Sequence, residues 1–72
     1  MIRFLEDVEL TIVTGFDEET DNITDEEVHV FHKGDEVDAS IETDNDNPSY
    51  CDIEFSIGVA HGVQRSLIEV IQ

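Results

Sequence analysis

Residues 28–41 read VHVFHKGDEVDASI and contain the pattern that decides the fold class. Apolar residues alternate with polar ones on both sides of a short polar segment, at Val28, Val30, Val37, Ala39 and Ile41. A two-residue period is typical of a half-buried β-strand, because successive side chains point to opposite faces. The segment between, residues 32–35 (HKGD), contains a glycine that supplies the backbone freedom of a turn. This stretch therefore predicts two strands joined by a turn.

The same alternation continues outward in both directions. It covers residues 2–4 and 8–13 on one side, and residues 50–55, 59–61 and 67–71 on the other. Glycines and a polar run separate these segments, at Gly15, residues 44–49, Gly58 and Gly62. The 72 residues therefore predict one acidic all-β domain, residues 1–72, folded as a small antiparallel barrel of five or six strands. One short helical turn is expected at residues 64–66.

The alternating segments also predict which side chains form the core. The expected core residues are Phe4, Val8, Leu10, Ile12, Val28, Val30, Val37, Ala39, Ile41, Ile53, Phe55, Val59, Val63, Ile68 and Val70. Residues 16–27 (FDEETDNITDEE) hold seven carboxylates and only two apolar residues, so we expect a long loop there. Two other architectures remain open: a half-open sheet, and a sheet covered by one helix, with residues 25–31 as the candidate helix.

From residue 28 onward, the order of features resembles a Src-homology-three barrel. That family has an apolar strand that leads through a lysine-glycine-acid turn into a second apolar strand, here residues 30–37 (VFHKGDEV). The family continues with a variable acidic loop, a strand, a glycine turn, a short helical turn and a last strand. The corresponding features here are residues 44–49, residues 50–55, Gly58, residues 62–66 and residues 67–71. The resemblance implies a small barrel over roughly the last two thirds of the chain.

The resemblance does not extend to the family's ligand groove. Polyproline helices dock on aromatic-lined grooves, but this chain has no tryptophan. Gln64, Arg65 and Leu67 replace the proline and tyrosine that the family places in its late helical turn. In size, charge and style the chain is also similar to the short acidic proteins of bacterial viruses.

The charge of the chain excludes several classes of partner. Nineteen acidic residues against three basic ones give a formal net charge of -16. Direct binding to nucleic acid or to an anionic membrane needs a basic footprint, which three scattered cations do not supply. The apolar runs are too short to span a membrane, and the single cysteine cannot form an internal disulfide. We expect a cytoplasmic protein, located in the host cytoplasm if it is viral.

No pattern in the chain predicts a metal site, a cofactor or a catalytic group. The three histidines and one cysteine lack the ligand spacing of a zinc site. Residues 44–55 begin like a calcium loop, but Ser49 and Phe55 replace its glycine and its closing glutamate. The serines lack the sequence context of an activated nucleophile. We therefore expect a non-catalytic protein without a cofactor, in which Cys51 is a buried structural residue.

The excess of carboxylates is the feature that points to a function, because it exceeds what solubility needs in a small domain. Alternate side chains on one strand lie about 7 Å apart, which is also two steps along a DNA strand. Such rows of carboxylates could imitate a phosphate backbone and block the basic surface of a host nucleic-acid-binding or defence protein. The expected acidic surface consists of Asp17, Glu18, Glu19, Asp21, Asp25, Glu26, Glu27, Glu36, Asp38, Glu42 and Asp44.

A second hypothesis assigns binding to apolar residues and leaves the acidity to solubility. Exposed apolar side chains surrounded by charged residues mark protein interfaces, and the candidate anchors are Phe16, Ile23 and Tyr50. Such a module would bind another protein or take part in virion assembly. A homo-oligomer formed through an uncovered edge strand also remains open.

Overall fold

Strands form where polar and apolar residues alternate between turn residues, and the predicted all-β class is confirmed. The computed structural model describes residues 1–71. Its strands are β1 (Ile2–Phe4), β2 (Val8–Asp17), β3 (Asn22–Phe31), β4 (Glu36–Val37), β5 (Ala39–Thr43), β6 (Tyr50–Phe55), β7 (Gly58–Gln64) and β8 (Ile68–Val70). One 3₁₀ turn, η1 (Arg65–Leu67), lies between β7 and β8. The helical turn begins one residue later than predicted, and residues 25–31 form a strand, not a helix.

The strands make two antiparallel sheets. One sheet has three strands in the order β4-β1-β8, and the other has five in the order β3-β2-β7-β6-β5. The chain passes from the first sheet to the second at Asp38, the single residue between β4 and β5. Strands β3 and β5 are the edges of the larger sheet and have no partner in the smaller one. Within residues 1–71, therefore, two open sheets are present and no closed barrel is detected.

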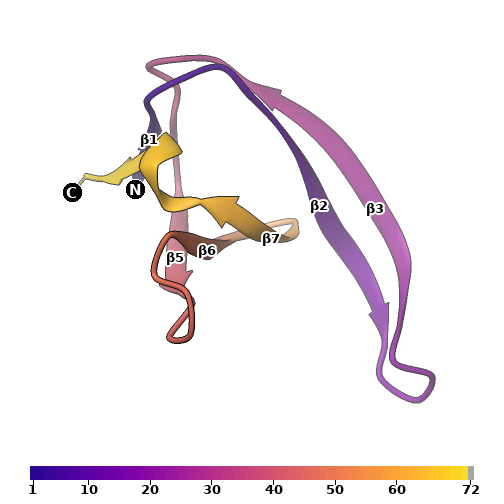
Figure 1. Ribbon diagram of the computed structural model, residues 1–72. Helices are drawn as coiled ribbons and strands as arrows, with labels where there is room; N and C mark the ends of the chain where they lie inside the picture. Colours follow the sequence, from indigo (N-terminus) through magenta and orange to yellow (C-terminus); the bar gives the residue numbers. More distant parts are fainter. Residues whose placement is uncertain (72) are drawn as a thin grey trace.

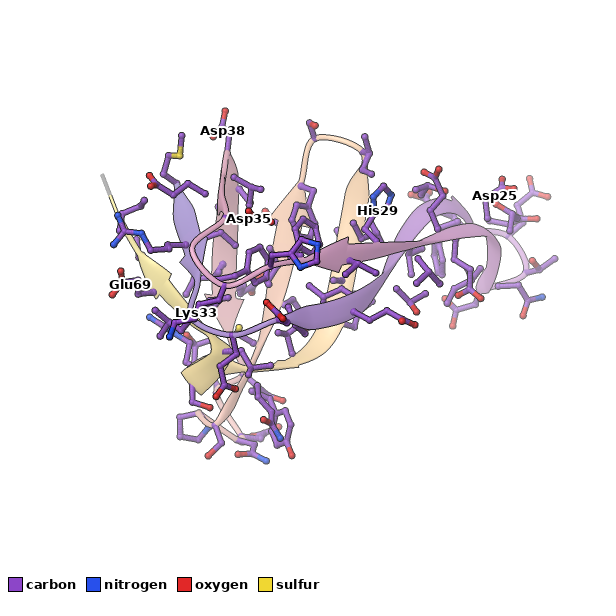
Figure 2. The ribbon with its side chains drawn as sticks, turned by 90° about the horizontal axis from the view of Figure 1, so that it is seen from above. Asp25, His29, Lys33, Asp35, Asp38 and Glu69 are labelled. Atoms are coloured by element: carbon purple, nitrogen blue, oxygen red, sulfur yellow. The ribbon has the colours of Figure 1, made fainter. Side chains whose placement is uncertain are left out.

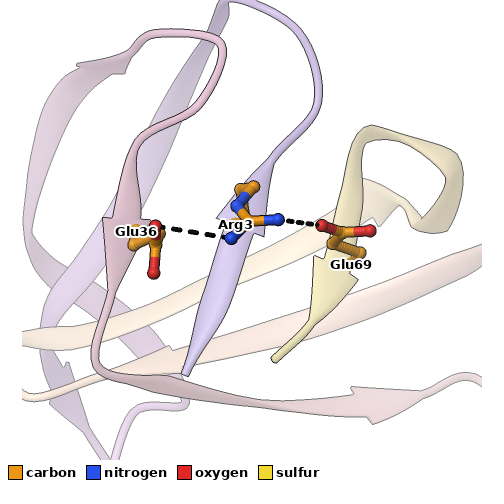
Figure 3. A network of polar contacts seen from close by, with 3 residues as sticks. All are labelled: Arg3, Glu36 and Glu69. Atoms are coloured by element: carbon orange, nitrogen blue, oxygen red, sulfur yellow. Dashed lines mark hydrogen bonds and ion pairs between the residues drawn. The ribbon is translucent and has the colours of Figure 1, made fainter. Parts of the chain in front are cut away.

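The smaller sheet brings the first strand and the last strand side by side (Figure 1). Its central strand β1 places Arg3 opposite Glu36 on β4 and opposite Glu69 on β8. The guanidinium lies 2.7 Å from a Glu69 carboxylate oxygen and 3.5 Å from one of Glu36, so it bridges both neighbours (Figure 3). Because all three side chains are partly exposed, the pairs fix the register more than they stabilise the fold.

One hydrophobic core lies between the inner faces of the two sheets. Its buried residues are Ile2, Phe4, Leu10, Ile12, Cys51, Ile53, Ala60, Val63 and Ile68. An aromatic stack extends the core, because the ring of Phe31 lies 4.4 Å from that of Phe4 and 5.6 Å from that of Phe55. The predicted burial of Cys51 is confirmed, whereas Ile2 and Ala60 were not among the expected core residues.

Four predicted core residues lie outside the core. Val28, Val30 and Val70 are more than half exposed, and Val59 is partly buried but does not pack on the core cluster. Side chains of β3 do alternate between its two faces, but the face that was expected to point inward points outward. The register with β2 places Phe31 opposite Val8, on the core face. Val30 lies opposite Glu9 and therefore on the outer face, because residues paired across two strands share a face.

The predicted long loop at residues 16–27 is also wrong. β2 continues past Gly15 to Asp17, and β3 begins at Asn22, so only residues 18–21 form the turn of a long hairpin. This hairpin leaves the rest of the molecule and projects to one side (Figure 1). The principal extents, 37 × 26 × 20 Å, reflect this projection, because a ten-residue strand is itself about 33 Å long.

The hairpin is attached to the larger sheet through a close approach of β2 to β7. Val13 on β2 pairs with Val59 on β7. A Cβ atom at Gly58 would collide with the carbonyl oxygen of Val13. Glycine is therefore needed at this position because it lets the two backbones meet.

The predicted turn at residues 32–35 is confirmed. The amide of Asp35 donates to the His32 carbonyl at 2.9 Å, and Gly34 has a φ of 92° that favours glycine. The 3₁₀ turn is the only helical segment in the described part of the chain. Residues 1–71 contain no helix that is long and apolar enough to cross a membrane.

Candidate functional site

The outer part of the hairpin, which we call the distal hairpin, comprises residues 13–27. It begins directly after Ile12, the last buried residue of β2, and none of its residues is buried. Its carboxylates are Asp17, Glu18, Glu19, Asp21, Asp25, Glu26 and Glu27, and it contains no lysine, arginine or histidine. Figure 2 shows Asp25 at one end of the molecule, with Lys33 and Glu69 toward the other. Lys33, and Arg3, which pairs with Glu69, are therefore remote from Asp25.

Local contacts and backbone conformation define the turn at the tip of the distal hairpin, residues 18–21. Asp17 accepts a hydrogen bond from the amide of Glu19 at 3.0 Å, which is an Asx turn. Asp21 has a φ of 59°, a left-handed conformation that aspartate tolerates better than most residues. The pairing of the strands shifts on both sides of Gly15, where a Cβ would lie 2.6 Å from the Thr24 hydroxyl. These features make the tip a defined turn.

The carboxylates of β3 in the distal hairpin point to both faces of the sheet. Glu27 pairs with Ile12 and shares its inward-facing side, whereas Glu26 pairs with Val13 on the outer side. Among the described residues, no ion pair involves a carboxylate of the distal hairpin. The negative charge there is consequently left for solvent ions or for a partner.

An apolar pair lies among these carboxylates. Phe16 on β2 is directly opposite Ile23 on β3, and their exposed fractions are 52% and 53%. Phe16 also borders a groove of about 380 Å³ that reaches from β2 to Val59 and His61 on β7. The hairpin thus brings two of the three expected apolar anchors together. The third, Tyr50, lies on β6 beside the 44–49 loop, where its amide donates to the Asn47 carbonyl at 3.1 Å.

The second expected row of carboxylates, on residues 36–44, does not exist as one face. Glu36 belongs to the smaller sheet and contacts Arg3, whereas Glu42 belongs to β5 in the larger sheet. Asp38 lies in the bend between the two strands, and Asp44 lies in the following loop. The row is interrupted because the chain changes sheet at the bend.

A smaller acidic group surrounds the β5–β6 connection, which we call the loop group. It consists of Glu42, Asp44, Asp46 and Asp52. Asp44 accepts hydrogen bonds from the amides of Asp46 and Asn47, at 2.9 and 3.4 Å, so its carboxylate already holds the loop. The sequence interpretation did not include Asp46 and Asp52 in the acidic surface. Their contribution depends on the pairing of β5 with β6, which places Glu42 opposite Asp52.

The residues that could bind a metal or carry out catalysis are dispersed. Within residues 1–71, no three histidine, cysteine, aspartate or glutamate side chains are placed to hold a metal ion. His32 lies 3.8 Å from Asp7, and His61 lies 3.4 Å from Asp52. Burial raises the pKa of the Cys51 thiol, which favours its protonated form.

Two features of the surface have no separate signal in the sequence. The first is the groove beside Phe16, which forms only because β2 pairs with β7. The second is the exposure of Val28 and Val30, which depends on the register of β3.

Comparison with known proteins finds no match, because no family model, no curated protein and no solved structure is similar enough to this chain.

Proposed function

We propose that this chain is a non-catalytic acidic protein that binds the basic nucleic-acid-binding surface of another protein and so acts as an inhibitor. The observation that carries the proposal is the distal hairpin, which projects seven carboxylates and no cation from the body of the protein. A surface of this kind steers rapidly onto a positively charged groove, because the unbalanced field acts before contact.

The two-sided placement of the carboxylates favours a groove over a flat surface as the target. Glu26 and Glu27 point to opposite faces of β3, so a flat partner would reach only one of them. A cleft that normally surrounds a nucleic acid strand would contact both. Asp25 and Glu27 lie two residues apart on one strand, a spacing of about 7 Å that is close to two steps along a DNA strand.

The order of the elements supports a Src-homology-three-like arrangement as part of this proposal. A strand bent between two sheets, β4–β5, is followed by the β6–β7 hairpin, the 3₁₀ turn and a last strand that pairs with β1. In this arrangement the distal hairpin corresponds to the long first loop of the family. The similarity in size and charge to short viral proteins favours a target in a host cell, such as a defence nuclease, a guide-RNA complex or a nucleoid protein.

The proposal is tested by measuring the affinity for a purified bacterial nucleoid protein over a range of salt concentrations. We expect the logarithm of the association constant to fall steeply with the logarithm of the salt concentration, and duplex DNA to compete. Glu18→Gln/Glu19→Gln is expected to weaken binding by about tenfold, since each lost contact with a cation is worth roughly 0.5–1 kcal/mol.

The matched control removes the same two charges from the loop group. Glu42→Gln/Asp46→Asn leaves the distal hairpin intact, so binding is expected to remain within about twofold of the unmodified protein. Affinity that is independent of salt, or equal loss in both double variants, would contradict binding through the distal hairpin.

A second candidate function is an interaction or virion-assembly module that binds through apolar contacts. The exposed Phe16–Ile23 pair and its groove favour this alternative. Phe16→Ala decides between the two, with Val70→Ala on β8 as the control, because Val70 is similarly exposed and is not one of the expected anchors. If Phe16→Ala loses binding, and high salt does not weaken the binding of the unmodified protein, the apolar module is supported. Unchanged binding of Phe16→Ala supports charge-driven inhibition.

A further inference from the structure

Strand β3 is a long edge with an unusual surface. It extends over ten residues, and among residues 1–71 it pairs with β2 alone. Val28 and Val30 lie side by side on its outer face with exposed fractions of 59% and 58%. An edge strand presents a row of unpaired amide and carbonyl groups that can pair with another strand. Exposed valines next to such a row supply apolar contacts for an added strand.

The edge lacks two of the usual protections against strand pairing. Natural edge strands often carry lysine or proline, and β3 contains neither. Its protection is instead the acidic segment of residues 25–27, which repels a second copy of the same chain. A segment with positive charge would be attracted by the same carboxylates, so the edge discriminates by charge.

The two faces of β3 define the side chains that an added strand would need. Val28 and Val30 point to the outer face, whereas Asp25 and Glu27 occupy the opposite face. Side chains of an added strand alternate between the same two faces. An extended segment in which apolar residues alternate with lysine or arginine would therefore match both faces at once.

We propose that the outer edge of β3 accepts an extended segment of the basic partner, with alternating apolar and basic residues, as an added strand. This inference rests on the proposed function and supplies its mode of binding. Main-chain hydrogen bonds would contribute affinity, Val28 and Val30 would contact the apolar side chains, and Asp25 and Glu27 would contact the cationic ones. Binding completes an edge that is open in the free protein.

The experiment uses a short peptide of alternating lysine and valine, and its counterpart with alternate main-chain amides methylated. The two peptides have equal charge, but the second cannot donate hydrogen bonds along one edge. We expect the first to bind about tenfold more tightly, because several main-chain hydrogen bonds are lost in the second. Amide hydrogen exchange should then slow in β3 and stay unchanged in β5, the other edge of the same sheet.

A pair of variants separates the valines from the general charge. Val28→Thr/Val30→Thr keeps the β-branched shape and the net charge but removes the apolar contacts, and is expected to bind the first peptide about fivefold more weakly. Val70→Thr is the control, because Val70 is equally exposed on β8, an edge of the smaller sheet. Its binding should equal that of the unmodified protein.

The possible outcomes separate this inference from the proposed function. Equal, salt-sensitive binding of both peptides would overturn strand addition while leaving charge-driven binding intact. Absence of binding by either peptide at low salt would overturn both. Slow amide hydrogen exchange in β3 of the peptide-free protein, together with twice the mass of one chain in light scattering, would identify a second copy as the occupant. This result would also overturn the inference.

Discussion

Ile53 and Ile23 occupy similar local sequences but have opposite surroundings. Each lies in a strand between two polar neighbours, in Asp-Ile-Glu and Asn-Ile-Thr respectively. Ile53 is fully buried in β6, which has a strand on either side and the smaller sheet over its inner face. Ile23 is 53% exposed in the distal hairpin, where no second layer covers the strands. Alternation therefore makes a strand, but only a packed second layer makes a core.

The largest expected effect compares these two isoleucines directly. Ile53→Ala should destabilise the fold by about 2–5 kcal/mol, because it leaves a cavity at a fully enclosed position. Ile23→Ala should cost no more than about 1 kcal/mol, since it removes only a cross-strand contact with Phe16. Urea unfolding followed by circular dichroism measures both. Similar losses in the two variants would mean that the distal hairpin is part of the core.

The next effect concerns the attachment of the hairpin to the body. Gly58→Ala should destabilise the protein by about 1–3 kcal/mol, because the added methyl group collides with the Val13 carbonyl and separates β2 from β7. Ser56→Ala, in the adjacent turn, changes an exposed side chain and should be neutral. Thermal unfolding compares the two variants. Unchanged stability in Gly58→Ala would show that the close approach does not hold the hairpin.

A smaller effect, in the opposite direction, is expected at the inner end of the hairpin. The Nε2 atom of His29 is buried and has no hydrogen-bond partner among the described residues. His29→Leu should therefore stabilise the protein by about 1 kcal/mol, since a buried polar atom without a partner carries a desolvation cost. His61→Leu is the control at an exposed position. Destabilisation by His29→Leu, measured by urea unfolding, would contradict this expectation.

The smallest effect tests where charge repulsion acts. Raising the ionic strength from about 0.01 to 0.15 M shortens the Debye length from about 30 to 8 Å and should stabilise the fold by a few tenths of a kcal/mol. Amide hydrogen exchange should slow most in the distal hairpin, where carboxylates have no neighbouring cation, and least in the β6–β7 pair. Uniform slowing over the chain would show that the hairpin bears no special electrostatic cost.

Local patterns predicted much of the fold. The alternation of residues 51–55 predicted β6, the HKGD segment predicted the turn before β4, and the helical turn was displaced by only one residue. These features depend on nearest neighbours along the chain, which a sequence displays directly. The acidic first part of β3, residues 22–27, was missed because acidic residues have low β-propensity, and its formation depends on pairing with β2.

The candidate site was predictable in composition but not in arrangement. The seven carboxylates of residues 17–27 lie so close together in the sequence that they form one group in space as well. The row expected on residues 36–44 was not formed, because one bend at Asp38 sends its two halves into different sheets. The loop group was missed because Glu42 and Asp52 are far apart in the sequence and meet only through the pairing of β5 with β6.

The amino-acid sequence by itself determined the fold class, the turn at residues 32–35 and the excess of negative charge, because each follows from residue types and short spacings. The tertiary structure alone decided which face of β3 points inward, and therefore that Val28 and Val30 are exposed while Phe31 packs on the core. It also decided that the acidic stretch extends away from the body as a hairpin. The physical reason is register: a shift of one residue reverses every side chain on a strand, and only contacts between distant segments select the register.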